Sequence, residues 1–467
     1  MYTSFWKTTF IYGAGFISLR MISFLLLPLY THLLSPYDAG IIFIIYTILA
    51  FGNTIYSRGM DAALFKFYSP ENESSLIRTS VIFSLKYGII LSIIIFCVLQ
   101  TLFILDIIQH PAITSNVLLG LLSVLFFDML TSRGLGLLRL INKPFYYLLI
   151  AITNVCLSVG LNLYLIQHLK MSLTGAIWAI IFVSWIQFAM IIPLLLSKIN
   201  KQRADDTLLV KMKKFSLPFL PAAIFLILIE LSDRWMIAWF SSNGAADVGI
   251  YGASYKFGSL IMLCVKSFNL NWQPYYLKQN TVHTFYKIGS LFLSFLIIIS
   301  TLISILWPIL FYLLIGKEFW AGGNIIPIIA ISYIFYGLFI LQMPSIYLQN
   351  KESWAPKLWG IGFIINSACN IILIPKYGYY GAAISTLLAY LGMTILLIYK
   401  NYSWMPMKYN FKYLGIIIII SIIAGYIFQG LIVEVAFDYN HFIQYYSLAI
   451  IYLIITMPIT WLLYKKT

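Results

Sequence analysis

Charged residues are scarce in this chain of 467 residues: they make up 10% of it, whereas 61% of the residues are hydrophobic. A soluble domain averages about 25% charged and about 45–50% apolar residues, and its surface grows too fast with size to hide so many apolar side chains. Acidic residues are the scarcest, with 15 Asp and Glu against 30 Lys and Arg. The cations punctuate long apolar runs and form no basic face, which excludes nucleic-acid binding. This composition indicates a polytopic membrane protein.

Cysteine and histidine are also rare, and neither forms a group. The four cysteines are far apart and each lies inside an apolar run, which excludes a disulfide scaffold and favours small buried hydrophobic side chains. The five histidines never approach one another in sequence, so we expect no metal site. The sequence contains no Gly-x-x-x-x-Gly-Lys-Ser/Thr loop, and direct use of ATP is therefore not expected.

Long apolar runs fill the rest of the chain. A membrane-crossing helix needs about 20 apolar residues. We expect helices because lipid offers backbone groups no partners, and the alternating pattern of outer-membrane strands is absent. A scan predicts about fourteen spans, at residues 9–31, 40–62, 80–105, 112–138, 145–169, 174–197, 215–240, 248–273, 285–313, 323–348, 355–375, 379–400, 412–433 and 443–464.

Lysine and arginine gather in alternate connections between these spans. The connections that follow odd-numbered spans hold only Lys170, Lys317 and Lys376 as cations, and they are short. The other connections and both ends of the chain are rich in cations. Because positive residues stay on the cytoplasmic side, we predict that both termini are cytoplasmic.

An internal repeat divides the predicted spans into two sets of six. Residues 38–41 (Asp-Ala-Gly-Ile) recur as 247–250 (Asp-Val-Gly-Ile), at an offset of 209. Residues 140–143 (Leu-Ile-Asn-Lys) match 348–351 (Leu-Gln-Asn-Lys), at an offset of 208. Six spans are an even number, so both copies start on the same side of the membrane, as in parallel transporter repeats.

We therefore predict an all-α protein with two parallel six-helix lobes, residues 1–200 and 201–400. Transmembrane helices 13 and 14, in residues 401–467, lie outside the repeat. Two similar lobes that face one another would enclose a cavity, which rocking of the lobes would expose to each side in turn.

Several motifs give the chain a family resemblance: Tyr12-Gly13, Leu27-Pro28, the run from Leu34 to Gly40 and the turn Asn142-Lys143. With the repeat and two extra spans, the chain resembles the polysaccharide-transporter (O-antigen flippase) family of the multidrug/oligosaccharidyl-lipid/polysaccharide exporter superfamily. The resemblance implies a flippase, not an enzyme, that moves an undecaprenyl-pyrophosphate-linked oligosaccharide to the outer leaflet of the bacterial inner membrane. The cargo would be an O-antigen or capsule repeat unit, and a polysaccharide polymerase and chain-length regulator would be partners.

Five of the cations within the predicted spans are candidate ligands, because a charge there is costly unless it faces a cavity or a partner. Arginine meets phosphate bidentately and lysine acts as a point charge. We predict that these five line a cavity and hold the pyrophosphate: Arg20, Arg58, Arg234, Lys256 and Lys266. Arg58 and Lys266 are repeat-equivalent at an offset of 208, and Tyr251 and Tyr255 could stack on sugar rings.

Carboxylates within the spans have two interpretations. Glu230, Asp233, Asp128 and Asp61 could carry a proton or bind a cation and so couple transport to an H+ or Na+ gradient. Alternatively they pair with nearby cations on their own segment: Glu230 with Arg234, Asp61 with Arg58 and Asp128 with Arg133.

Two other functions remain as alternatives. A cation-coupled multidrug exporter of the same superfamily would favour a cavity of neutral or negative charge. A membrane glycan polymerase or ligase would need a sizeable outer loop, and the predicted outer connections have about ten residues or fewer.

Overall fold

The computed structural model describes residues 22–105, 111–199, 205–217, 219–278, 282–406, 411–431 and 439–466. Helices make up nearly all of these residues, and no strand occurs among them, which confirms the all-α class. The chain forms two compact units. Unit 1 comprises residues 1–34 and 42–227, and unit 2 comprises residues 35–41 and 228–467. The predicted lobe boundaries at residues 200 and 400 stay predictions.

Unit 1 begins with a helix over Ile22–Leu33. Ser35 precedes the next helix and its Oγ accepts the N–H of Asp38 at 3.1 Å, while Pro36 takes the first helical position, both common at helix starts. Within this unit α5 packs on α4, α6 and α7. The helices that follow are α2 (Pro36–Ser57), α3 (Met60–Phe67), α4 (Glu73–Ile104), α5 (Ser115–Leu140), α6 (Pro144–Asn162) with the π-turns of Leu163–His168, α7 (Ser172–Ile199) and α8 (Asp206–Ser216).

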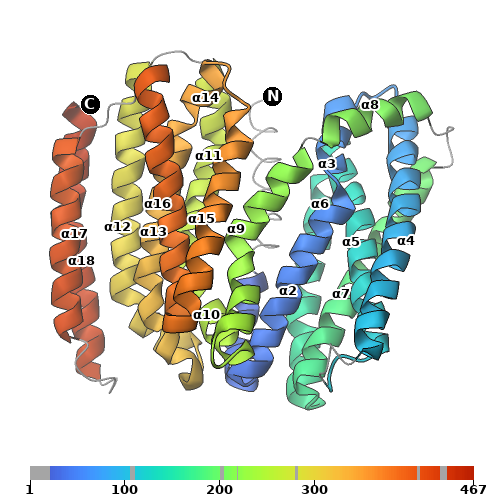
Figure 1. The fold of residues 1–467 in the computed structure, drawn as a ribbon, viewed down its shortest axis with the longest axis horizontal. Helices are drawn as coiled ribbons and strands as arrows, with labels where there is room; N and C mark the ends of the chain where they lie inside the picture. Colours follow the sequence, from blue (N-terminus) through green and yellow to red (C-terminus); the bar gives the residue numbers. More distant parts are fainter. Residues whose placement is uncertain are drawn as a thin grey trace. The chain divides into compact units, whose positions relative to one another are not determined.

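The short helix α8 lies across the ends of α3 and α4 (Figure 1). Asp205 caps it, because its Oδ1 accepts the N–H groups of Thr207 and Leu208 at 2.8 and 3.1 Å. The Thr207 hydroxyl also donates to this carboxylate, and this hydrogen bond lowers the pKa of Asp205 below its usual value. A polar helix outside the apolar spans is thereby fixed to unit 1.

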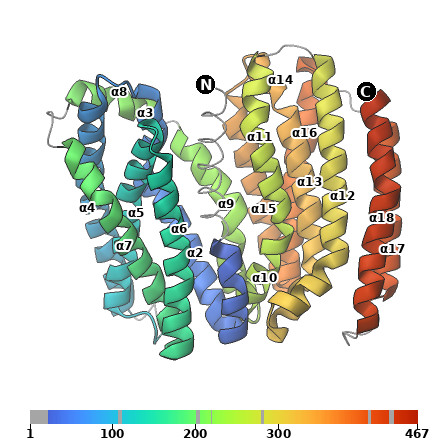
Figure 2. The ribbon, with the colours of Figure 1, turned by 180° about the vertical axis from the view of Figure 1, so that it is seen from behind.

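The main part of unit 2 begins within α9, at Leu228, and continues to the C-terminal helices. In Figure 2, α12 lies between α13 and the pair formed by α17 and α18, and α12 contacts all three. The helices are α9 (Phe219–Phe240), α10 (Ala245–Gly258), α11 (Leu260–Lys278), α12 (Val282–Leu314), the 3-10 segment η2 (Lys317–Ile325), α13 (Ile326–Gln342), α14 (Pro344–Leu348), α15 (Trp354–Tyr377), α16 (Tyr379–Trp404), α17 (Phe411–Leu431) and α18 (Tyr439–Lys466).

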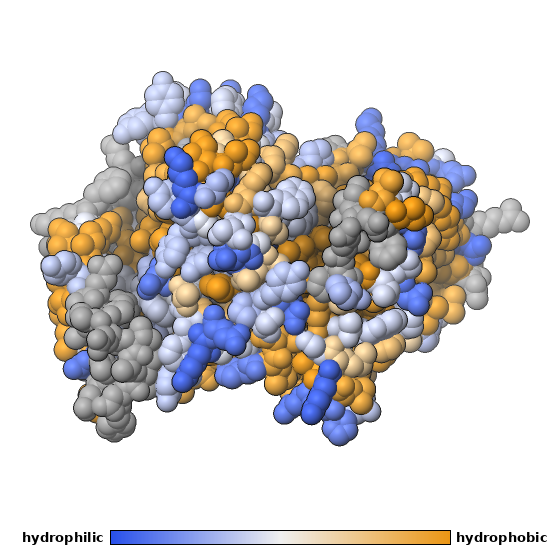
Figure 3. Space-filling view, turned by 60° about the horizontal axis from the view of Figure 1, so that its bottom comes forward, coloured by the Kyte–Doolittle hydropathy of each residue, from blue (hydrophilic) through white to orange (hydrophobic). Residues whose placement is uncertain are grey.

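Ten helical segments among the described residues are long and apolar enough to cross a membrane, and α10 with α11, bent by 46°, would make an eleventh. Each predicted span overlaps a helix, but the count of fourteen stays a prediction. On α4, Ile89, Ile90, Ile93 and Ile94 are each 50–60% exposed, as expected of a surface that faces lipid. Figure 3 shows hydrophilic side chains interspersed with apolar ones on the face that comes forward when the molecule is tilted by 60° from the view of Figure 1.

Backbone geometry repeats at the offset found in the sequence. Asn142 and Asn350 both adopt a left-handed conformation, with φ of 55° and 54°. Each is followed by a lysine whose N–H reaches back five residues, from Lys143 to Leu138 at 2.9 Å and from Lys351 to Ile346 at 2.7 Å. This is the Schellman ending of a helix. The two matched tetrapeptides therefore end helices in the same way.

The other matched tetrapeptides meet in space, within unit 2. A Cβ atom on Gly40 would lie 1.7 Å from the carbonyl oxygen of Ala245, and one on Gly249 would lie 2.0 Å from that of Pro36. Pro36 and Ala245 differ by the repeat offset of 209, as do Gly40 and Gly249. The contact is thus reciprocal between repeats, and only glycine lets the two backbones approach so closely.

The reciprocal contact predicts that Gly249→Ala destabilises the protein. The added methyl group would meet backbone, which cannot rotate away, so we expect a loss of about 1–3 kcal/mol and a lower melting temperature in detergent. Gly415→Ala is the matched control, since nothing lies within 4 Å of a Cβ placed there. Equal melting temperatures for the two variants would contradict the close crossing.

Candidate functional site

Arg234 in α9 is the most buried of the predicted cations that the structure describes, with 8% of its surface exposed. Its guanidinium carbon lies 4.8 Å from the ring centroid of Tyr255 and 5.9 Å from that of Tyr251. Nη1 donates to the carbonyl oxygen of Glu230 at 3.1 Å. Tyr251 and Tyr255 are buried, so in this conformation they pack against Arg234 instead of presenting a face to a sugar.

The Glu230 carboxylate pairs with a different cation from the one its sequence position predicts. Oε1 accepts from Lys266 Nζ in α11 at 2.7 Å, whereas Arg234 contacts only the main chain of Glu230 among the contacts described. The predicted local pair of Glu230 with Arg234 is wrong, because α11 brings a lysine to the carboxylate. Lys256 in α10 is half-buried in the same unit. Three predicted cations thus belong to unit 2.

Asp233 lies at the centre of a buried polar cluster and has no exposed surface. Oδ2 accepts from the Tyr251 hydroxyl at 2.7 Å and from the Thr386 hydroxyl at 2.9 Å. Oδ1 accepts from Asn370 Nδ2 at 2.9 Å. The donors come from α10, α16 and α15, so one carboxylate joins four helices.

Two asparagines extend this cluster along α15. Asn370 Nδ2 also donates to Asn366 Oδ1 at 3.0 Å, and both residues are fully buried. Among the described atoms no partner satisfies Asn370 Oδ1 or Asn366 Nδ2. Neither asparagine nor Thr386 was predicted as a site residue. Two asparagines four residues apart in an apolar span would have been the signal, because they share a helix face.

Asp128 in unit 1 is held by two neutral side chains. Its carboxylate accepts from Ser184 Oγ in α7 at 2.6 Å and from Asn53 Nδ2 in α2 at 3.3 Å. It does not pair with Arg133 among the described contacts, so that predicted pair is wrong. The carboxylate is therefore hydrogen-bonded without being neutralised by an ion pair.

Arg133 pairs instead with Asp61. The guanidinium has no exposed surface and also donates to the carbonyl oxygen of Ser57 at 3.0 Å. Asp61 accepts from Ser57 Oγ at 2.6 Å and from Ser132 Oγ at 2.8 Å. The predicted pair of Asp61 with Arg58 is thus wrong as well, because a buried guanidinium from α5 takes the carboxylate.

Arg58 lies at a break in its span. It has a positive φ of 49° and Gly59 one of 70°, so α2 ends at Ser57 and α3 starts at Met60. The guanidinium packs over the Tyr87 ring at 5.1 Å. Lys266, in contrast, lies inside α11, so these two repeat-equivalent positions differ in local structure. Arg20 lies outside the described residues.

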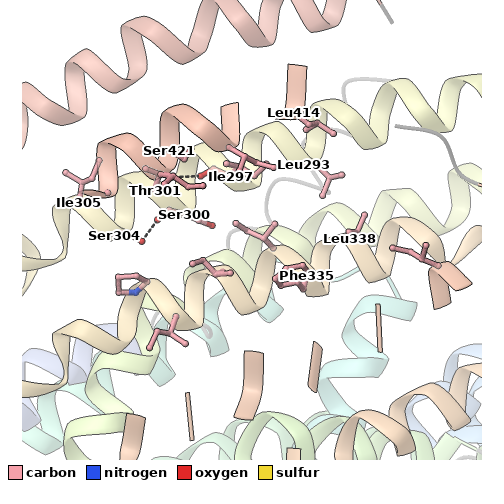
Figure 4. Close-up of a pocket in the computed structure, with 18 of the residues that line it drawn as sticks. Leu293, Ile297, Ser300, Thr301, Ser304, Ile305, Phe335, Leu338, Leu414 and Ser421 are labelled. Carbon is pink, nitrogen blue, oxygen red and sulfur yellow. Dashed lines mark hydrogen bonds between the residues drawn. The ribbon is translucent and has the colours of Figure 1, made fainter. Parts of the chain in front are cut away.

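An apolar cavity of about 1190 Å³ lies in unit 2 between α12, α13, α16 and α17 (Figure 4). Its hydroxyl groups are mostly turned to their own helices: Thr301 donates to the Ile297 carbonyl at 2.9 Å and Ser304 to that of Ser300 at 2.7 Å. The wall is therefore largely hydrocarbon, with few free polar groups. Leu293, Ile297, Ile305, Phe335, Leu338 and Leu414 contribute to it.

These features define an all-helical, multi-pass membrane protein built on a repeated bundle with charges buried in its spans. A family model described as polysaccharide biosynthesis protein matches residues 5–279. The chain belongs to this family. The probable low-salt glycan biosynthesis flippase Agl15 of Haloferax volcanii is 27% identical over 114 residues, which are 24% of this chain and 24% of that protein.

Solved structures share the fold at low sequence identity. The lipid II flippase MurJ, in an inward closed conformation, superposes with a TM-score of 0.71 over 98% of this chain and 99% of MurJ, at 16% identity. An inward-facing multidrug resistance MATE family transporter of the MOP superfamily gives 0.60 over 85% of this chain and 94% of its own, at 12% identity. The predicted MOP-type fold is thus confirmed.

The ion pair in unit 1 predicts that Asp61→Asn lowers stability. The substitution would leave the Arg133 charge buried without a countercharge, at a cost of about 2 kcal/mol. Thermal unfolding in detergent measures this loss. Asp206→Asn, at an exposed position of α8, is the control and should unfold like the parent protein; the same unfolding temperature for Asp61→Asn would show that the pair does not stabilise the unit.

Proposed function

We propose that this protein is a flippase that carries an undecaprenyl-pyrophosphate-linked oligosaccharide from the cytoplasmic to the outer leaflet by alternating access. Membership of the polysaccharide biosynthesis family supports the proposal. Two of its relatives are described as flippases, one of them of lipid II. Export of cationic drugs is the alternative, and its substrates would favour carboxylates over cations.

The single observation that carries the proposal is the setting of Arg234. A pyrophosphate that crosses the low-dielectric centre of a bilayer needs compensating positive charge. Glu230 neutralises Lys266 through their ion pair, while Arg234 rests on tyrosine rings, which stabilise a cation without cancelling its charge. Arginine stays protonated in proteins, so the Arg234 charge persists beside Lys256 and Lys266. Arg234, Lys256 and Lys266 are therefore proposed to receive the pyrophosphate.

The apolar cavity of unit 2 supports a substrate with a hydrocarbon part. A glycan would leave its hydroxyl groups without partners against such walls, whereas an isoprenoid chain would bury apolar surface there. The pyrophosphate and the sugars would then lie near the cations, and the isoprenoid chain would lie in the cavity. Two chemically different regions within one unit thus support this substrate class.

Ion coupling is proposed at Asp233. Its carboxylate accepts hydrogen bonds from neutral groups of three other helices, and a nearby amide oxygen, Asn370 Oδ1, lacks a partner among the described atoms. Carboxylate and amide oxygens are suitable ligands for a small hard cation, and a buried carboxylate equally takes up a proton. Asp128, with its weaker shell, is the second candidate.

The distribution of cations supports an inner-membrane location with both termini in the cytoplasm. We further propose that a polysaccharide polymerase and a chain-length regulator act on the flipped product. The predicted outer connections, which are short, favour transport over glycan synthesis by this chain itself.

We predict that Arg234→Ala, and likewise Arg20→Ala, lowers flipping without removing the protein from the membrane. Because a hydrogen bond to a charged group contributes about 1.5–3 kcal/mol, transport should fall by about tenfold or more. The measurement is surface polysaccharide in a deletion strain that carries each variant, with protein quantified in membranes. A second readout is the leaflet that holds the lipid-linked oligosaccharide, which should be the inner one.

Lys317→Ala, at an exposed position of η2, is the control and should export normally. Normal export by both arginine variants would refute the proposed role. Accumulation of the oligosaccharide in the outer leaflet on deletion would point to a polymerase, and efflux of a cationic dye to the drug exporter.

We predict that Asp233→Asn uncouples transport from its ion gradient. Proteoliposomes with an imposed Na+ or H+ gradient should show faster flipping by the parent protein with one of the two, and no response to either by the variant. Asparagine keeps the shape and the hydrogen-bonding oxygen but loses the charge. Glu318→Gln, exposed on η2, should respond like the parent protein. An undiminished response in Asp233→Asn would exclude Asp233 as the coupling residue.

A further inference from the structure

Two lysines converge on one indole ring at the end of unit 2 that is predicted to be cytoplasmic. Lys357 Nζ lies 5.2 Å from the ring centroid of Trp354 and Lys400 Nζ lies 4.8 Å from it. The two ammonium groups are therefore at most about 10 Å apart. Trp354 begins α15 and Lys400 lies in the last turns of α16, and these two helices pack against each other.

Aromatic rings surround the two lysines. The Trp404 ring meets the Trp354 ring at 5.5 Å in an edge-on arrangement, and Lys400 also lies 5.8 Å from the Tyr399 ring. Cation–π contacts hold an ammonium group in place but do not neutralise it. The rings thus position two positive charges near each other and leave both available to an anion.

Carboxylates do not balance this charge among the residues that the structure describes. None of the ion pairs found there involves Lys357 or Lys400. Glu352 lies two residues before Trp354 and is exposed, and the first turn of α15 contains no acidic residue. The mutual repulsion of the two lysines would be relieved by an anion from outside the chain.

The depth of the cluster identifies the source of that anion. Tyr399 and Tyr402 are 69% and 77% exposed, and aromatic side chains at span ends mark the level of the lipid headgroups. Phosphates of anionic lipids lie at this level and attract basic side chains. A soluble anion would compete poorly there, because the headgroup phosphate is already concentrated in two dimensions.

The cluster is absent from the other repeat. Trp354 and Lys357 correspond to Tyr146 and Leu149 at the offset of 208, and Lys400 corresponds to Leu194 at the offset of 206 that relates Gly175 to Gly381. None of these three counterparts carries a charge. The cluster is therefore not part of a symmetric passage between the repeats.

We propose that Lys357 and Lys400, held against the Trp354 ring, bind the phosphate of an anionic phospholipid of the surrounding bilayer. This lipid site is separate from the residues proposed to receive the transported pyrophosphate, and it does not depend on the proposed function.

Lipid binding to purified protein in neutral detergent tests the proposal. Phosphatidylglycerol and phosphatidylcholine are titrated in turn, with bound lipid counted by native mass spectrometry. The parent protein should bind phosphatidylglycerol more tightly, and the double variant Lys357→Gln/Lys400→Gln should bind it about tenfold more weakly, a difference that shrinks at high salt. The melting temperature in phosphatidylcholine alone should match that of the parent and shows that the variant is folded.

Lys376→Gln is the matched control, because Lys376 is an exposed lysine at the opposite end of the same helix, α15. It should bind phosphatidylglycerol as the parent does. Equal binding by the double variant, or an equal loss in Lys376→Gln, would overturn the proposal. Inorganic phosphate that binds to the parent protein as tightly as phosphatidylglycerol would also overturn it, since the site would then be one for a soluble anion.

Discussion

Lipid offers no partner to a charge, so every ionised group inside a span has to be met by the protein itself. This constraint organises the helices of both units. Asp233 takes its hydrogen bonds from Tyr251, Asn370 and Thr386 and so links α9 to α10, α15 and α16. Arg133 reaches from α5 to Asp61 at the start of α3 and to the end of α2. The few polar residues therefore specify which apolar helices pack together, since apolar surfaces by themselves are nearly equivalent in lipid.

The buried cations are stabilised by two kinds of interaction, which have different consequences for their charge. Arg133 is paired with a carboxylate, so its charge is cancelled and the pair acts as a structural link. Arg234 rests on Tyr255 and Tyr251, so its charge is stabilised but persists. A persistent charge in a low-dielectric region is expensive unless an anion arrives to share it. The same residue type thus serves packing at one site and is proposed to bind a phosphate at the other, and the difference lies in its neighbours.

The sequence allowed the spans and the repeat to be predicted, because both depend on local properties. Apolar length locates a helix in a membrane, and the left-handed asparagines Asn142 and Asn350 end helices wherever their tetrapeptides occur. The ion pairs could not be predicted in the same way. Spacing along one helix predicted ion pairs of Glu230 with Arg234 and of Asp128 with Arg133, whereas the partners in the structure come from other helices. The helix break at Arg58 and Gly59 has no counterpart at Lys266, the repeat-equivalent residue. This break depends on how α3 packs, and the hydrophobic periodicity of the sequence does not reveal it.

A comparison of the two repeats shows which residues are the same in both copies and which differ. Gly40 and Gly249 persist because each backbone must pass the other at the same crossing. Buried charge is different, since every charged side chain needs its own set of partners. Asp233 and Arg234 correspond to Phe24 and Leu25 at the offset of 209 that relates Pro36 to Ala245, although Asn370 retains its counterpart Asn162. Asn162 is buried and donates to the Ser158 carbonyl at 2.7 Å, and phenylalanine stands at the position equivalent to the aspartate. A duplicated bundle thus keeps the same close backbone crossing in both copies, while the hydrogen-bonded shell of a buried carboxylate forms where the aspartate and its donors occur together.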